Sequence, residues 1–394
     1  MKKNKGIATV GIMTFILSII MGTIAFAAYA APVEIEFLTP LWNEDVRKWY
    51  ENEMIPEFEK LHPDIKVRIA YVTWNEYDDK RLVATAAGVG PDAWLVPAAN
   101  AALQGYREQI IPLDEFVEKS KAEMNLGDFL PQALVSQQFE GKLYAIPNTL
   151  NLRTYVTNMD LFSKVGMDPK APLGDWSDFI RLVRRLSGTY DYSKINSFKV
   201  VTMSQYWGAV LLESGVNWLG PNWELRFDSP EGVALINYLT DLFTAGGANP
   251  AMWTGGGLYD GTTAMAFTEI ANLRAADKAF CGGAYFLPEP VRQTAVFPIT
   301  GFGISNASKN PEAAWKWILF HTNSENLTRF NAFYGRVPPR LSSMRSAEIM
   351  NDVLLRQAAD VAARYGKPEP LMNPYGLDTA STAVARLNDM FNGN

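Results

Sequence analysis

The spacing of apolar residues near the beginning of the chain switches repeatedly between two periods, and this switching restricts the fold more than any other feature. Residues 33–37 and 65–71 place apolar side chains at every second position, which is the period of a β-strand. The stretches 46–61 and 76–87 predict helices, and 93–96 form a short apolar run after a Pro-Asp turn. This order predicts a βαβαβ unit with a parallel sheet, and ligands of such sheets bind at the carboxyl ends of the strands.

The second half of the chain predicts further helices. Asn310 followed by Pro311 is typical of a helix start, and Ser324 begins another helix that Gly335 ends. The 394 residues exceed the size of a typical single domain, and no repeat or low-complexity linker divides them. We therefore expect two α/β lobes between which the chain crosses more than once.

The first thirty residues have the layout of a secretory signal peptide. Lys2, Lys3 and Lys5 form a positive start, residues 6–28 are largely apolar, and Ala-Tyr-Ala at 28–30 matches a cleavage pattern. This layout predicts a signal peptide of residues 1–30 and an exported mature protein, in the periplasm or at the extracellular face of the cell envelope. An uncleaved anchor is the alternative, because the apolar run is long enough to span a bilayer.

The charged and reactive residues exclude several classes of function. Lys and Arg number 36 against 42 Asp and Glu, a net charge of −6 that argues against a nucleic-acid partner. With 2 His and 1 Cys, an internal disulfide is impossible and a zinc site of His and Cys ligands is not expected. The chain has no P-loop, nucleophile elbow or zinc-protease motif, and the Gly-Phe-Gly at 301–303 lacks the third glycine of a dinucleotide fingerprint. We therefore expect no catalytic residue, no metal and no cofactor.

Several segments along the mature chain resemble, in order and spacing, the extracellular solute-binding proteins of sugar ABC transporters. The resemblance is to the maltose-binding-protein-like family 1, and it covers essentially the whole mature chain. The segments that carry it are FEKLHPDIKV, AAGVGPDAW, GKLYAIPNTLN, TNMDLFSKVGMDP, GTTAMAF and YGRVPPR.

The resemblance implies a two-lobed α/β fold of the type II periplasmic-binding-protein kind, with three crossings between the lobes. The implied N-terminal lobe comprises residues 31–148 and 300–335, and the implied C-terminal lobe comprises 149–299 and 336–394. The crossings are expected near residues 147–151, 298–301 and 335–337.

The function that the resemblance implies is that of a binding protein and not of an enzyme. It would capture a mono- or oligosaccharide in the cleft between the lobes, close by hinge motion, and deliver the ligand to the permease subunits of an ABC importer, acting as a monomer. The aromatic content of 12% fits this function, because sugar rings stack on aromatic faces while amides, carboxylates and arginines bind hydroxyls. Two alternatives stay open: a secreted glycosidase that uses two carboxylates, and an adhesion or scaffold protein of the same fold.

Residue chemistry and the resemblance together predict the ligand contacts. They are Trp42, Asn100, Asn151, Tyr155, Gln205, Tyr206, Trp207, Trp253, Glu269, Phe302, Arg336 and Tyr375. Among the aromatic residues, Tyr206 and Trp207 are favoured because adjacent rings before an amphipathic helix are difficult to bury together. Trp42 is as compatible with packing at the first helix as with a ligand contact, and Trp74 is left out because a surface role fits it equally well.

Two predicted contacts depart from the family pattern. Asn151 stands where the family often has a sugar-binding acid, and an amide at this position can still bind hydroxyl groups. Glu269 and Ala271 stand where the family often has a glycine and a stacking tryptophan, which argues against a maltodextrin-type specificity. Glu269 is expected to accept hydrogen bonds from hydroxyls instead.

Overall fold

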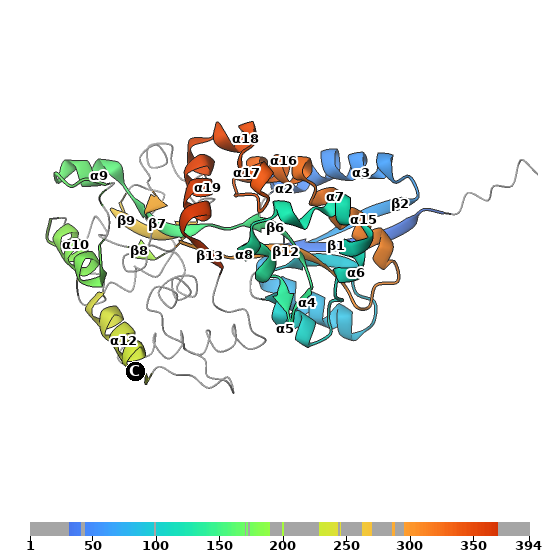
Figure 1. Ribbon diagram of the computed structural model, residues 1–394, viewed down its shortest axis with the longest axis horizontal. Helices are drawn as coiled ribbons and strands as arrows, with labels where there is room; N and C mark the ends of the chain where they lie inside the picture. Colours follow the sequence, from blue (N-terminus) through green and yellow to red (C-terminus); the bar gives the residue numbers. More distant parts are fainter. Residues whose placement is uncertain are drawn as a thin grey trace, which may run out of the picture.

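The computed structural model shows two lobes side by side, each formed around its own β-sheet (Figure 1). The structure describes residues 31–40, 44–97, 100–169, 171, 174–189, 199–200, 228–242, 245, 262–269, 286–287 and 295–368, and all structural statements concern these residues. The predicted signal peptide lies outside them. Within these ranges no helix is both long enough and apolar enough to cross a bilayer.

The sheet of the first lobe has five strands in the order β2-β1-β3-β12-β6. The strands are β1 (Val33–Pro40), β2 (Ile65–Val72), β3 (Ala93–Val96), β6 (Ile146–Leu150) and β12 (Ile299–Ile304). β1 pairs in parallel with β2 and β3, while β12 is antiparallel to both β3 and β6. The predicted parallel βαβαβ unit is therefore confirmed, and it forms one side of a mixed sheet.

Two helical connections join the three parallel strands. Between β1 and β2 lie α2 (Glu44–Trp49), a π-helical turn (Tyr50–Met54) and α3 (Ile55–Leu61). The wide turn is consistent with Pro56, which has no amide hydrogen for the usual helical bond, and the amide of Ile55 donates instead to the carbonyl of Tyr50. Between β2 and β3 lies α4 (Trp74–Ala86).

Further helices surround the first sheet. They are α5 (Asn100–Tyr106), α6 (Asp114–Lys119), α7 (Lys121–Met124), the 3₁₀ turn η2 (Leu126–Asp128), α8 (Pro131–Val135), α15 (Pro311–His321) and α16 (Ser324–Tyr334). A short hairpin of β4 (Gln138–Phe139) and β5 (Lys142–Leu143) lies among them. The predicted starts of α15 and α16 are confirmed, and Gly335 ends α16 with a φ of 75°.

Aromatic rings fill the core between the first sheet and its helices. Phe37 on β1 packs edge-on against Phe302 on β12, with ring centroids 5.0 Å apart. Trp317 on α15 contacts Phe37 at 6.2 Å and Phe58 on α3 at 5.2 Å. All four rings are completely buried, so the helices α3 and α15 are fixed on the sheet by burial of apolar surface.

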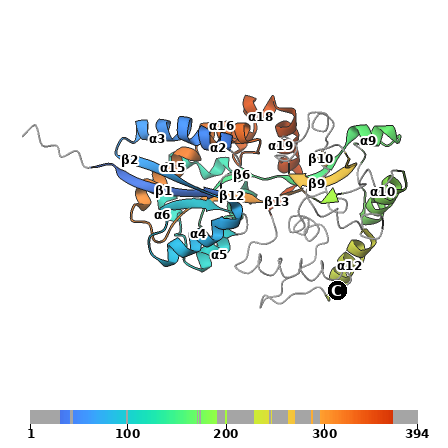
Figure 2. The same cartoon turned by 180° about the vertical axis from the view of Figure 1, so that it is seen from behind.

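The second lobe has a sheet in the order β13-β11-β7-β9-β8, and β10 pairs with β7. Its strands are β7 (Arg153–Thr157), β8 (Lys199–Val200), β9 (Met265–Glu269), β10 (Phe286–Leu287), β11 (Ala295–Phe297) and β13 (Gly366–Pro368). The helices of the lobe are α9 (Met159–Lys164), α10 (Trp176–Thr189) and α12 (Pro230–Leu242). Three further helices, α17 (Leu341–Met344), α18 (Ala347–Met350) and α19 (Val353–Tyr365), lie over the junction of the two sheets in both views (Figure 2).

The chain passes between the two sheets three times. Asn151 and Leu152 join β6 to β7, and Pro298 joins β11 to β12. The third passage leads from α16 past Val337 to α19 and β13. Leu150 forms a β-bridge with Val337, and the amide of Asn151 donates to the carbonyl of Pro298 at 3.0 Å, so the three passages lie together. The expectation of two α/β lobes with three crossings is confirmed.

Candidate functional site

The carboxyl ends of four strands meet along one edge of the first sheet. β6 is antiparallel to β12, and β12 is antiparallel to β3, so β6 runs in the same direction as β1, β2 and β3. The chain crosses to the second lobe at this same edge, directly after β6. This is the position at which open α/β sheets bind ligands.

Three predicted ligand contacts carry buried polar atoms at this edge or at the crossings. Asn100 begins α5 after β3, Asn151 follows β6, and Arg336 lies on the third crossing. Among the described residues, no hydrogen-bond partner is found for Oδ1 of Asn100, Oδ1 of Asn151 or Nε of Arg336. Buried polar groups are usually paired with protein or water, so two acceptors and one donor are left without partners at this edge and at the crossings.

A buried ion cluster joins the third crossing to the second sheet. Arg153 on β7 donates to Oε1 of Glu269 on β9 from Nε at 3.0 Å and from a terminal nitrogen at 2.9 Å. Arg336 donates to the other oxygen, Oε2, at 2.5 Å. The three side chains are only 9–12% exposed. Both carboxylate oxygens of Glu269 therefore already accept hydrogen bonds from guanidinium groups.

The charges of this cluster determine the ionisation of Glu269. Burial by itself would raise the pKa of Glu269, but the adjacent Arg336 and Arg153 outweigh burial and lower the pKa to about 2. Burial likewise opposes the charge of Arg336, yet Glu269 raises the pKa of Arg336. The guanidinium of Arg336 also lies 4.9 Å from the ring centre of Tyr334, so it contacts an aromatic ring as well as the carboxylate of Glu269.

Buried amides and hydroxyls connect the crossings inside the first lobe. Thr300 donates from its hydroxyl to Oδ1 of Asn148 at 2.7 Å, which joins the second crossing to the first. Asn331 on α16 donates to the backbone carbonyl of Asn148 at 2.9 Å, and the hydroxyl of Thr149 donates to Oδ1 of Asn331 at 2.5 Å. The residues that link the three crossings are thus polar and are held in one arrangement by mutual hydrogen bonds.

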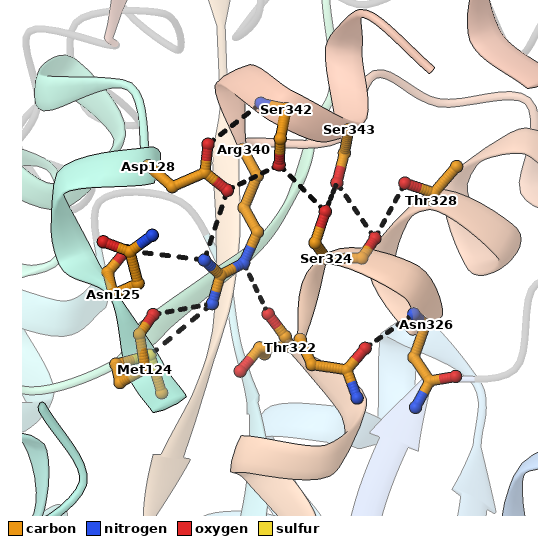
Figure 3. A network of polar contacts seen from close by, with 11 residues as sticks. Met124, Asn125, Asp128, Thr322, Ser324, Asn326, Thr328, Arg340, Ser342 and Ser343 are labelled. Atoms are coloured by element: carbon orange, nitrogen blue, oxygen red, sulfur yellow. Dashed lines mark hydrogen bonds and ion pairs between the residues drawn. The ribbon is translucent and has the colours of Figure 1, made fainter. Parts of the chain in front are cut away.

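The third crossing is fixed to the first lobe by Arg340 (Figure 3). Arg340 is 2% exposed and donates to the backbone carbonyls of Thr322 at 2.7 Å and Met124 at 2.8 Å. Asp128 accepts from Arg340 at 3.4 Å and from the amide and hydroxyl of Ser342 at 2.9 and 2.6 Å. Residues 336–340 therefore form one charged contact to each lobe: Arg336 contacts the second lobe and Arg340 contacts the first.

Two predicted contacts lie in the cores of the lobes instead of at a surface. Tyr155 is completely buried between Phe179 and Phe267, with ring centroids at 5.1 and 5.3 Å. Phe302 is completely buried against Phe37. Neither ring is accessible in this structure, because each packs into the core of its lobe.

The remaining predicted contacts lie outside the described residues, and their roles stay predictions. They are Trp42, Gln205, Tyr206, Trp207, Trp253 and Tyr375.

Trp74 is a residue at the strand ends that the sequence prediction left out. It is the first residue of α4, directly after β2, and its side chain is 44% exposed. A capping box of Thr73 and Glu76 starts the helix, and this pattern is visible in the sequence as a threonine followed three residues later by a glutamate. The strand before it and the capping box together would have been enough to place Trp74 at the sheet edge.

No metal site is evident in the part of the chain that the structure describes, where no group of three or more His, Cys, Asp or Glu side chains is arranged to hold an ion. The chemistry that the described residues offer is hydrogen bonding by amides and guanidiniums together with an exposed indole. These groups can bind a neutral polyhydroxylated molecule without a cofactor.

Two lobes joined by three crossings, with polar groups at the strand ends, define a solute-binding protein of the clamshell kind. The sequence profile of the family described as bacterial extracellular solute-binding protein matches residues 53–357. This chain belongs to that family, whose members are binding proteins.

Two of the curated relatives that match this chain each match part of it. An arabinooligosaccharide-binding protein of Bacillus subtilis is 23% identical over 198 residues, which are 48% of this chain and 43% of the relative. A "Probable amino-acid ABC transporter periplasmic-binding protein" of Sinorhizobium fredii is 20% identical over 259 residues, which are 60% of this chain and 57% of the relative. The chain thus spans about half the length of the curated relatives it matches.

Solved structures match the fold over most of the chain. An ABC substrate-binding protein from Listeria monocytogenes in complex with cycloalternan has a TM-score of 0.77 at 21% identity, covering 92% of this chain and 94% of the other. A solute-binding protein from Thermotoga lettingae bound with α-D-tagatose has a TM-score of 0.76 at 18% identity, with coverage of 92% and 95%. The sugar-binding protein MalE from Xanthomonas citri has a TM-score of 0.77 at 17% identity, with coverage of 92% for both chains.

Proposed function

We propose that this protein is the substrate-binding component of an ABC importer and that it captures a carbohydrate between its two lobes. The observation that carries the proposal is the set of buried atoms without partners among the described residues, on Asn100, Asn151 and Arg336. They combine acceptors and a donor, and hydroxyl groups of a sugar both donate and accept. The carbohydrate complexes among the similar structures support the same class of ligand.

The geometry of the crossings supports binding with closure. Three adjacent passages form a hinge, and the groups for the ligand lie at the edge of the first sheet that faces this hinge. A ligand that contacts both lobes has its full set of contacts only when the lobes approach, so it favours the closed arrangement. The buried Glu269 keeps Arg336 ionised and oriented while the ligand enters and leaves.

The cellular role follows from the family and the first thirty residues. We propose that residues 1–30 direct export, that the mature chain acts in the periplasm or at the extracellular face of the envelope, and that it works as a monomer. The closed form would deliver the carbohydrate to the membrane permease. We propose that the protein binds and releases the carbohydrate without changing it chemically.

The direct test is thermal unfolding of purified residues 31–394 with a panel of carbohydrates, polyols and amino acids. A carbohydrate at 100 times its dissociation constant should stabilise the protein by about 2.7 kcal/mol. The stabilised sample should contain the carbohydrate unchanged after long incubation. Stabilisation by amino acids alone would contradict the proposed ligand class, and turnover of a glycoside would contradict a pure binding role.

A matched pair of variants connects the ligand to the site. Arg336→Lys keeps the charge but removes the planar fork, so it should weaken carbohydrate binding by roughly tenfold or more. Arg345→Lys, an exposed arginine nine residues further on, should leave the affinity unchanged. Equal affinities for both variants and the parent protein would place the ligand elsewhere.

A further inference from the structure

The exposure of Trp74 distinguishes it from the other tryptophans that the structure describes. Trp94 and Trp317 are completely buried, Trp315 and Trp49 are 5% and 6% exposed, and Trp176 is half-buried, whereas Trp74 is 44% exposed. An indole has a large apolar face, so exposing one at a sheet edge that binds ligands is typical of a stacking surface.

Local contacts support one side of the Trp74 indole and fix the start of the helix that carries it. The carboxylate of Glu76 accepts from the amide of Thr73 at 3.3 Å and from the Thr73 hydroxyl at 3.0 Å, which fixes the start of α4. The indole packs edge-on against Tyr77, with ring centroids 5.9 Å apart. Tyr77 is completely buried and donates its hydroxyl to the carbonyl of Leu95 on β3. Since the indole already packs against this buried ring, it loses less conformational freedom than an unsupported side chain when a ligand stacks on it.

The order of the strands places Trp74 at the far end of the sheet from the crossings. β2 is one edge strand, and β6, which leads into the first crossing, is the other. Four strand-to-strand steps of about 4.8 Å separate them, which corresponds to roughly 19 Å along the row of strand ends. Asn100, after β3, lies between the two ends of this row.

This separation restricts the size of a ligand that uses both ends. A single pyranose ring is about as wide as one strand step, so a monosaccharide that binds Asn151 and Arg336 at the crossings does not reach Trp74. A chain of linked rings lying along the strand ends reaches both. We infer that the ligand is an oligosaccharide and that Trp74 stacks on the sugar unit farthest from the crossings, an inference that rests on the proposed function.

The test is the dependence of affinity on ligand length. Isothermal titration with arabino-, xylo-, manno- and malto-oligosaccharides, each from the monosaccharide to the pentasaccharide, is carried out on the parent protein, on Trp74→Ala and on Trp74→Phe. Tyr106→Ala, which removes an exposed ring (52% exposed) at the other end of α5, is the matched control.

The expected result is an affinity of the parent protein that rises with chain length in one of the series. Trp74→Ala should lose about tenfold or more of the affinity for the longest oligosaccharides and less than about twofold for the shortest ligand. Trp74→Phe should recover most of the loss, and Tyr106→Ala should match the parent protein at every length.

Two outcomes would overturn the inference while the proposed function stands: a parent protein that binds a monosaccharide as tightly as its oligomers, or a Trp74→Ala variant that equals the parent protein at every chain length. Failure of the parent protein to bind any carbohydrate, with an amino acid bound instead, would overturn the proposed function itself. The two kinds of failure are therefore distinguished by the parent protein alone.

Discussion

Glu269 shows how the chemistry of one residue depends on partners that are distant in the sequence. The carboxylate was expected to face a ligand, yet its two oxygens accept from Arg153, 116 residues away, and from Arg336, 67 residues away. Removing one member of a buried ion pair leaves the other charges without compensation. At this scale Glu269 acts by holding two arginines, one on the second sheet and one on the third crossing.

The first prediction concerns the stability that Glu269 provides. The pKa of Glu269 is lowered to about 2, so its contribution is complete above its ordinary pKa near 4.5 and is lost as the pH falls from 4.5 toward 2. This loss should amount to about 3 kcal/mol of unfolding free energy. Glu269→Gln should be destabilised by a similar amount at pH 7 and should lack this acid loss in urea titrations, whereas the exposed Glu325→Gln should behave like the parent protein. Identical titrations for Glu269→Gln and the parent protein would contradict the cluster.

His321 provides a second prediction, in a different pH range. Burial lowers the pKa of His321 to about 3. Its Nε2 lies 2.8 Å from the hydroxyl of Tyr50 in the core of the first lobe. As the pH falls below 6.5, the histidine takes up a proton in the unfolded chain but stays neutral in the folded protein. The free energy of unfolding should therefore fall by about 2 to 3 kcal/mol between pH 6.5 and pH 4.5. His321→Gln should remove most of that slope. His62→Gln, on the partly exposed second histidine, should keep it, and a slope that survives in His321→Gln would assign the loss to other groups.

At the scale of elements, the third crossing is a short segment, residues 336–340, with an arginine at each end. Gly335 ends α16, Arg336 binds Glu269 of the second sheet, Val337 pairs with Leu150, and Arg340 binds carbonyls of the first lobe. The guanidinium of Arg340 lies 4.1 Å from the ring centre of Phe129, which adds a cation–π contact to its hydrogen bonds. This segment is therefore bound to the second lobe through Arg336 and to the first lobe through Arg340.

The third prediction tests the contacts of Arg340 with the first lobe. Arg340→Lys keeps the positive charge but replaces the planar guanidinium with a single ammonium group. The ammonium cannot bind Thr322, Met124 and Asp128 at once, so the variant should lose about 2 kcal/mol or more of unfolding free energy. Urea unfolding followed by circular dichroism measures this loss. Arg345→Lys, in the same segment but exposed, is the control, and equal midpoints for the two variants would show that the Arg340 contacts contribute little.

The elements could be predicted from the sequence where a local rule acts. Alternation in 33–37 and 65–71 marks the strands β1 and β2, and Pro311 marks the start of α15. The burial of Tyr155 and Phe302 could not be predicted, because alternation does not say which side of a strand faces the core. The pairing of Glu269 with two arginines depends on the register of β7 with β9 and on the crossing, which no local pattern encodes.

At the scale of the whole molecule, we propose that the three adjacent crossings act as a hinge between the lobes. The polar network of Asn148, Thr300 and Asn331 keeps the passages together, while Asn100 and Asn151, which are proposed to bind the ligand, lie at the sheet edge beside them. Binding energy from contacts to both lobes is what shifts such a molecule from open to closed. We therefore propose that carbohydrate binding and closure of the lobes occur together.

Small-angle X-ray scattering of residues 31–394, with and without the carbohydrate identified by thermal unfolding, measures whether the lobes close on binding. We expect a smaller radius of gyration at saturating carbohydrate, and no decrease with a sugar that does not bind. Arg336→Lys should require a higher carbohydrate concentration for the same decrease, since its affinity is lower. An unchanged radius of gyration, with binding demonstrated in the same sample by calorimetry, would contradict closure and would place the carbohydrate on the surface of a single lobe.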